Sequence, residues 1–300
     1  MELRHLRYFV AVAEEGSITN AAERRLFTAQ PSLSRQIREL ETEVGVKLLD
    51  RKARGITLTA AGRVFLDHAR LALLQVDTAA EAARLAERPA RSVFVIGFLI
   101  GQEVAWLPET MRILREEAAD IEVMVVSQSS PELASALMRG KLDVAFLRRE
   151  ALTTGIAFKS LVHEPLVVLL PADHRLAKRK AIPPRELERE IFINPARMAP
   201  VLKSVIDDYA EKICIKLKPD YDADNLSAAM SLVASTGGLT LFPAYVQNML
   251  TRSVVARPLS GEPPTIELLM GYDKSNTSPA LKKFLARADE LIQCVSRPSA

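Results

Sequence analysis

The run from Ser17 to Ile37, SITNAAERRLFTAQPSLSRQI, constrains the fold most, because its pattern indicates two short helices joined by a tight turn. At roughly 100° per residue, the leucines and arginines of the later helix, which begins near Pro31, fall on opposite sides. The apolar stripe comprises Leu33, Ile37, Leu40 and Val44; the outer face carries Pro31, Arg35, Arg38 and Thr42, flanked by Ser32 and Ser34. No acidic residue lies between Arg24 and Arg38, so the outer face suits the phosphates and base edges of a DNA major groove, where Gln30, Gln36, the serines and the arginines are its polar groups.

Composition favours folded, cytoplasmic domains. Hydrophobic residues make up 48% of the 300, no apolar run approaches the roughly 20 residues of a membrane helix, and residues 1–4 begin no signal peptide. Cys214 and Cys294 belong to no Cys/His cluster, so we expect reduced, structural thiols and neither a disulfide framework, a metal site nor a cofactor.

The excess positive charge lies entirely in the N-terminal third. Residues 1–92 hold 15 Lys and Arg against 12 Asp and Glu, whereas residues 93–300 hold 25 of each kind. Because this imbalance coincides with the helix pair, it favours a nucleic-acid partner for that part of the chain.

Residues 1–59 form a predicted winged helix-turn-helix domain. A first helix, starting near Leu3, ends near Gly16, Ser17 caps the second, and the third begins near Pro31. Residues 46–49 and 56–59 then indicate a short hairpin around a basic turn that contains Arg51, Lys52 and Arg54. A basic hairpin beside such a helix, a wing, would add contacts to phosphates or the minor groove.

Residues 60–88 are predicted to form one long linker helix, and Pro89 to Ser92 a hinge. A helix of roughly 29 residues needs a partner to cover its apolar seam. The expected seam comprises Phe65, His68, Ala72, Val76, Ala79, Ala83 and Ala86.

Residues 93–300 alternate strand-like and helical runs, which predicts a two-lobed α/β domain. The expected lobes are about 93–165 with 266–300, and about 166–265, with strands at 93–98, 121–127, 143–147, 166–170, 191–194, 239–242 and 266–272 and helices at 104–117, 131–140, 201–212, 224–236 and 279–294. Two crossings between the lobes would make a hinged cleft for a small ligand.

Motifs along nearly the whole chain give it a family resemblance. They include Leu26 to Ile37, Leu40-Glu41, Gly45, Leu48-Leu49, Arg51, Leu58 to Gly62, Val95 to Phe98, Gly140 to Phe146, Pro165 to Pro171, His174 to Ala177 and Leu232 to Pro243. With these in register the chain resembles the LysR-type transcriptional regulators. Residues 1–12 and 267–270 resemble the branch that controls aromatic-acid catabolism, such as the benzoate, muconate and phenylpropionate regulators.

The resemblance implies a DNA-binding regulator with a periplasmic-binding-protein-like sensor, assembled as a homodimer or homotetramer on a promoter operator, where RNA polymerase is a further expected partner. The expected effector is an aromatic or other small carboxylate. The predicted DNA contacts are Ser17, Ile18, Gln30, Pro31, Ser32, Ser34, Arg35, Arg38, Arg51, Lys52 and Arg54.

Helix N-termini that face the cleft suit a carboxylate, because their N–H groups point outward. Arg148 is the expected fixed cation, with lobe-to-lobe ion pairing as its alternative role; Ser130 is either a ligand contact or a plain cap, and matches a carboxylate-contacting hydroxyl of the branch. Relatives commonly have serine at Gly101, so a gap is expected there. The predicted effector contacts are Ile100, Gly101, Gln102, Ser129, Ser130, Arg148, Asn194, Pro195, Arg197 and Phe242.

Two other classes of protein remain as alternatives. An α/β enzyme is disfavoured because no nucleotide-binding or nucleophile motif is present and the four histidines lack metal-ligand spacing, so no catalytic residues are expected. A solute-binding protein fits the C-terminal lobes but not the N-terminal 90 residues or the absence of a signal peptide.

Overall fold

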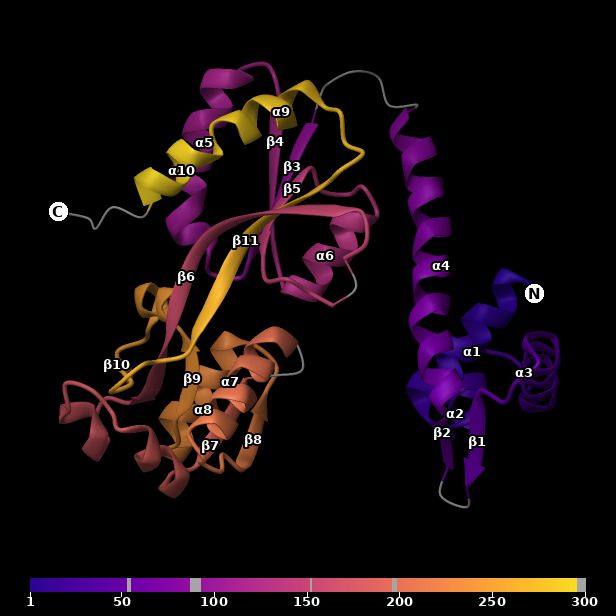
Figure 1. Cartoon of the computed structure of the whole chain (residues 1–300), viewed down its shortest axis with the longest axis horizontal. Coiled ribbons are helices and arrows are strands. Elements are labelled where there is room, and N and C mark those ends of the chain that lie inside the picture. The colour runs from indigo at the N-terminus through magenta and orange to yellow at the C-terminus, as the bar shows by residue number, and fades with distance from the viewer. Residues whose placement is uncertain (53–54, 87–92, 152, 196–198, 296–300) are drawn as a thin grey trace. The chain divides into compact units, whose positions relative to one another are not determined.

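The computed structural model describes residues 1–52, 55–86, 93–151, 153–195 and 199–295, with the backbone alone at residues 51, 52 and 81–86. The chain divides into two compact units, Met1–Arg88 and Pro89–Ala300. The first is mostly helical and the second is an α/β unit, as predicted (Figure 1).

The N-terminal unit contains the predicted helices and hairpin. Its elements are α1 (Leu3–Glu15), α2 (Ile18–Asn20) continued by a π-helical segment (Ala21–Leu26), α3 (Gln30–Val44), β1 (Leu49–Lys52), β2 (Gly55–Leu58) and α4 (Ala60–Ala86). Gly16 ends α1 in a left-handed conformation, and the Ser17 hydroxyl caps α2 by accepting from the amide of Asn20. β1 begins later than expected, so residues 51 and 52 belong to the strand rather than to the turn.

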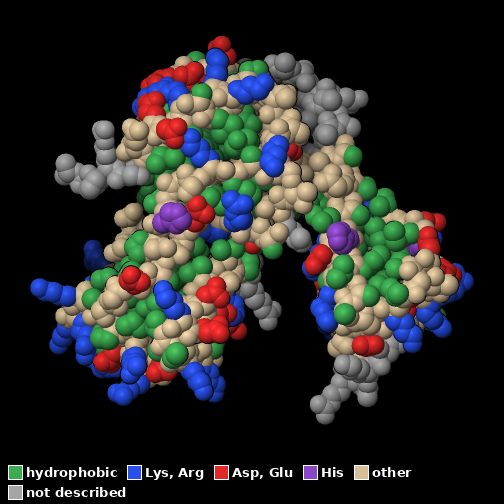
Figure 2. Space-filling view, viewed as in Figure 1, with side chains coloured by type: hydrophobic (Ala, Val, Ile, Leu, Met, Phe, Trp, Pro, Cys, Tyr) green, Lys and Arg blue, Asp and Glu red, His purple; other side chains and the backbone are tan. Residues whose placement is uncertain are grey.

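The predicted apolar stripe of α3 is the centre of this unit's core. Leu33, Ile37 and Leu40 are fully buried. Phe65 of α4 also points into the core, with its ring 5.1 Å from that of Phe9, so placing Phe65 in the linker seam was wrong. The other seam residues with described side chains are exposed: His68, Ala72, Val76 and Ala79. Hydrophobic side chains lie along part of α4 (Figure 2).

Contacts among five motif residues connect the head to the start of α4. Glu41 accepts hydrogen bonds from the amides of Leu48 and Leu49 at 2.8 and 3.0 Å. Thr59 caps α4, since its hydroxyl accepts from the amide of Gly62. A Cβ at Gly62 would lie 2.0 Å from the carbonyl oxygen of Leu48, so only glycine permits this approach of the two backbones.

The C-terminal unit follows the predicted alternation with two additional short strands. Its first elements are β3 (Val93–Leu99), α5 (Glu103–Glu117), β4 (Glu122–Gln128), α6 (Ser130–Met138), β5 (Val144–Leu147) and β6 (Ile156–Pro171). The next are β7 (Phe192–Pro195), α7 (Pro200–Lys212), β8 (Pro219–Ala223), α8 (Leu226–Thr236), β9 (Thr240–Pro243) and β10 (Val254–Pro258). It closes with β11 (Thr265–Asp273), α9 (Pro279–Ala286) and α10 (Ala288–Val295), where one helix was expected.

Strand β6 is much longer than predicted and runs through both lobes (Figure 1). Its first part pairs with β11 as far as Pro165, and its second part, from Leu166, pairs with β9 and β10. In the described residues the strand order is β10-β6-β11-β5-β3-β4, with β9 also on β6. Pro165, which has no N–H to donate, sits where the pairing changes. Each lobe has its own apolar core.

Candidate functional site

The outer face of α3 presents the expected residues to solvent. Gln30, Pro31, Ser32, Arg35 and Arg38 are exposed. The side chain of Arg35 is 70% exposed, and Glu39 lies 3.5 Å from its Nε. A pair this exposed contributes little free energy, so the guanidinium is available to an anionic partner.

Three side chains that were expected near that face are buried instead. Ser34 is 5% exposed, Gln36 9% and Ile18 7%. The side-chain oxygen of Gln36 accepts from Nε2 of His5 at 3.0 Å, and its amide nitrogen donates to Glu39 at 2.8 Å, so Gln36 secures the helix. Ser32 and Ser34 lie at similar angles on either side of the outer face, but only the Ser34 side is covered. Because their side chains are buried, Ser34 and Ile18 do not fit the predicted role of direct DNA contacts. Ser17 is half-buried, and its hydroxyl caps α2.

The wing is described through its backbone. Arg51 pairs with Ile56 and Lys52 with Gly55 in an antiparallel hairpin. The side chains of Arg51 and Lys52, and all of Arg54, lie outside the described residues.

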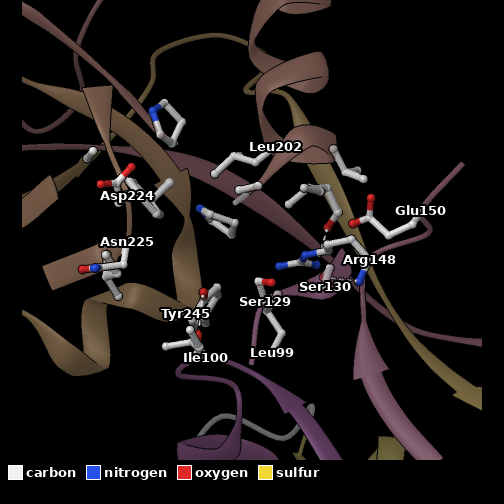
Figure 3. Close-up of a pocket in the computed structure, with 18 residues that line it drawn as sticks. Leu99, Ile100, Ser129, Ser130, Arg148, Glu150, Leu202, Asp224, Asn225 and Tyr245 are labelled. Atoms are coloured by element: carbon white, nitrogen blue, oxygen red, sulfur yellow. Dashed lines mark hydrogen bonds between the residues drawn. The ribbon is translucent and has the colours of Figure 1, made fainter. Parts of the chain in front are cut away.

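The C-terminal unit contains a cavity of about 250 Å³ between its lobes (Figure 3). Six of the ten predicted effector residues line it: Ile100, Ser129, Ser130, Arg148, Pro195 and Phe242. The rest of the lining is mainly apolar, and comprises Leu99, Glu150, Ala199, Val201, Leu202, Ala223, Asp224, Asn225, Leu226, Pro243, Tyr245 and Ile266.

Residues at the N-termini of α6, α7 and α8 face this cavity. Ser129 caps α6 in a capping box, and its hydroxyl donates to Glu132 at 2.7 Å. Ser130 accepts from the amide of Arg148 at 2.9 Å, which leaves the hydroxyl hydrogen to donate. Asn225 caps α8 through its side-chain oxygen, and within the described structure no acceptor takes its Nδ2 hydrogens. The outward N–H groups at these places in the lining are favourable for an anion.

Arg148 is buried, at 4% exposure, and its charge is balanced by the protein. Its guanidinium donates to Glu164 of β6 at 2.5 Å and to the carbonyl of Ile266 at 3.5 Å. Gln102 donates its amide to both carboxylate oxygens of Glu164, at 3.1 and 3.0 Å. Arg148 is therefore ion-paired, but its partner Glu164 belongs to the same lobe, so the lobe-to-lobe pairing considered for Arg148 is not the pairing observed. Gln102 lies in this network rather than in the cavity lining.

Gly101 leaves no gap for a hydroxyl. Its φ is +90°, and a Cβ there would lie 2.5 Å from Sδ of Met249 and 2.9 Å from Cε2 of Tyr245. The expected space is filled by these side chains, so the predicted role of Gly101 in the cavity is wrong. Asn194 also points elsewhere, donating to Asp222 at 2.9 Å. Arg197 lies outside the described residues.

Glu150, Asp224, Asn225 and Tyr245 were missed by the sequence reasoning. Asn225 directly precedes a helix, so the rule for capping residues would have found it. Glu150 follows the carboxyl end of β5 by three positions, where cleft residues of α/β folds lie. Burial raises the pKa of Glu150 to about 7 and that of Tyr245 well above its ordinary value. The Tyr245 hydroxyl donates to the carbonyl of Ile100 at 3.0 Å.

Other functional groups are sparse in the described part of the chain. No cluster of three or more His, Cys, Asp or Glu residues there could hold a metal ion. Cys214 and Cys294 are exposed and free. Among the described helices none is long and apolar enough to cross a bilayer.

A winged helix-turn-helix unit and a two-lobed unit with an interlobe cavity together define a ligand-responsive DNA-binding regulator. Comparison with known families agrees. The lysR-family bacterial regulatory helix-turn-helix protein model matches residues 3–63, and the LysR substrate binding domain model matches residues 87–292. The chain belongs to the LysR family of transcriptional regulators, as predicted, and is not an enzyme.

Relatives and solved structures match over nearly the full length. The chain is 39% identical over 302 residues to the Hca operon transcriptional activator HcaR of Escherichia coli (strain K12), covering 99% of this chain and 100% of that protein. It is 33% identical to the regulator AlsR of Bacillus subtilis (strain 168), covering 95% and 94%. The crystal structure of full-length BenM superposes with a TM-score of 0.59 and 26% identity, covering 100% of this chain and 99% of that one. The family binds DNA and small-molecule effectors, and forms oligomers.

Proposed function

We propose that the protein controls transcription by binding promoter DNA through α3 and the wing, and that a small carboxylate, aromatic or otherwise, held in the interlobe cavity modulates this binding. The lining of the cavity is the observation that favours a small carboxylate as the effector. Its walls are mainly apolar, yet the N-termini of α6, α7 and α8 face it. An apolar body with an anionic end matches those two features.

The carboxylate would be held by neutral donors rather than by a free cation. Arg148 is already paired with Glu164, so its attraction for a second carboxylate is reduced. The hydroxyl of Ser130 and the amide of Asn225 can both donate to the ligand. Relatives from the branch that the sequence resembles, HcaR, CatR and BenM, support an aromatic acid as the first candidate.

The exposed seam on α4 supports assembly with a second copy, into a dimer and then a tetramer. Val64 and Val76 of this helix are 62% and 36% exposed. Apolar side chains this exposed favour cover by a partner helix. We expect the protein to act in the cytoplasm, where it meets operator DNA and RNA polymerase.

Two measurements on the full chain test this function. A thermal-shift series with benzoate, 3-phenylpropionate, cis,cis-muconate and aliphatic carboxylates should reveal an acid that raises the melting temperature, because a ligand of the folded state stabilises it. Ser130→Ala should weaken that shift while the exposed Ser231→Ala does not. A mobility-shift titration with the protein's own promoter should show binding that weakens steeply with salt. Salt-independent or absent DNA binding, or the failure of every acid, would contradict the corresponding half of the proposal.

A further inference from the structure

Glu150 places a half-buried carboxyl group in the wall of the cavity. Its Oε1 is fully buried and, in the described part of the chain, accepts no hydrogen bond. The backbone carbonyl of Glu150 accepts from the hydroxyl of Thr153 at 3.2 Å, which holds the segment after β5. Figure 3 shows Glu150 on the same side of the cavity as Arg148 and Ser130, whereas Asp224 and Asn225 lie on the opposite side.

Among the residues that the structure describes, the charged groups around the cavity do not neutralise this carboxyl. The guanidinium of Arg148 is engaged by Glu164 and Ile266. Arg149 stacks over the ring of Phe158, with its Cζ 4.6 Å from the centroid. Asp224, the other carboxyl in the lining, has the same sign. An unpaired carboxyl in an apolar wall is costly, so a ligand group that pairs with it gains affinity.

The protonation of Glu150 narrows the kind of ligand group that fits. Because burial raises its pKa to about 7, both forms are present near neutral pH. The ionised form needs a hydrogen-bond donor and the protonated form needs an acceptor. A hydroxyl group supplies both, whereas a second carboxylate would be repelled by the ionised form. The volume of about 250 Å³ is below the common range of about 300–1,000 Å³ and suits a single ring with a short side chain.

We propose that Glu150 makes the sensor selective for effectors that carry a hydroxyl group in addition to the carboxylate, a hydroxylated aromatic acid in the first instance. This inference rests on the proposed function, since it concerns the ligand of the same cavity. The carboxylate lies at the helix N-termini, and the hydroxyl pairs with Glu150. Glu150 is thus the residue that distinguishes hydroxylated acids from unsubstituted ones.

Titration calorimetry of the full chain with matched pairs tests the selectivity. The pairs are 3-phenylpropionate with 3-(3-hydroxyphenyl)propionate, and benzoate with 3-hydroxybenzoate. In the wild type at pH 8 the hydroxylated acid of at least one pair should bind about tenfold tighter or more, the gain of a hydrogen bond to a charged group. At pH 6 the preference should shrink, because the protonated carboxyl tolerates the unsubstituted acid better. Glu150→Leu should abolish the preference, and Glu150→Gln should keep part of it without the dependence on pH.

The outcomes separate the inference from the function on which it rests. If the wild type binds these acids without a preference, or if Glu150→Leu keeps the preference, the role of Glu150 is wrong and the carboxylate effector stands. If the wild type binds no acid of either pair, the aromatic-acid effector fails and the inference fails with it. A circular dichroism spectrum of Glu150→Leu that matches the wild type shows that the variant is folded.

Discussion

Arg148 and Glu164 form a buried ion pair where β6 passes from one lobe to the other. Arg148 follows the end of β5, and Glu164 lies next to Pro165, where β6 exchanges β11 for β9 and β10. The pair is 4% and 10% exposed in its side chains. A buried pair costs desolvation that its mutual attraction only partly offsets, so its main effect is to specify one arrangement of the strands around it.

Removing one member of this pair should destabilise the protein strongly. Glu164→Leu leaves the Arg148 charge buried without its partner, and we expect a loss of about 3–5 kcal/mol in the free energy of unfolding. The double substitution Arg148→Met with Glu164→Leu should recover most of that loss. Asp207→Ala, which breaks the exposed pair with Lys203, is the control and should cost less than about 1 kcal/mol. Urea unfolding measures all three, and an additive double variant would contradict the prediction.

Arg35→Ala should weaken operator binding by about 1–3 kcal/mol and leave the fold intact, because the side chain is 70% exposed on the outer face of α3. A mobility-shift titration with circular dichroism measures both effects. Arg115→Ala, an exposed arginine of α5, is the control and should not change the affinity. Unchanged affinity of Arg35→Ala would remove that face of α3 from the interface.

Gly101→Ser should destabilise the sensor more than Gly155→Ser. Both glycines have a positive φ, +90° and +82°, so a serine strains the backbone at either position. Only at Gly101 does a Cβ also meet Met249 and Tyr245, whereas nothing lies within 4 Å at Gly155. Strain alone costs about 1–3 kcal/mol, and the contact adds to it. Equal losses in thermal unfolding would show that the neighbours of Gly101 move aside freely.

The stability of Glu150→Gln relative to the wild type should rise with pH. The folded-state pKa of Glu150, about 7, lies above its ordinary value of 4.5, so the folded protein holds this proton more tightly than the unfolded chain. That contribution is fully present below pH 4.5 and is lost as pH rises toward 7. Glutamine removes the loss, so the variant should gain about 1–2 kcal/mol between pH 5 and 8, a figure reduced for partial solvent access. Glu150→Leu should show the same trend, and urea unfolding without that trend would contradict the raised pKa.

Local patterns predicted most elements, because helix periodicity, caps and glycines are properties of neighbouring residues. The stripe of α3 and the ends of α1 are examples. Strand β6 was predicted at only part of its length, since a proline and charged residues interrupt its apolar pattern where it changes partners. Strands β8 and β10 were missed because their pairing is with distant parts of the chain.

The cavity residues also differ in whether local sequence could predict them. Residues that follow strands or cap helices, such as Ser129 and Ser130, could be placed from chain order alone. The burial of Ser34, the filled space at Gly101 and the pairing of Arg148 with Glu164 depend on side chains far away in the sequence. No local pattern contains that information.

The contact between Gly62 and Leu48 determines how movement can reach the DNA-binding face. The backbones of α4 and the head touch there, and the rings of Phe9 and Phe65 and the ion pair of Arg70 with Glu14 lie along the same side. With these contacts the head and the first turns of α4 form one rigid unit. A rotation of α4 would therefore turn Arg35 through the same angle, and in the proposed dimer the separation of the two Arg35 side chains would follow from how the two α4 helices are paired.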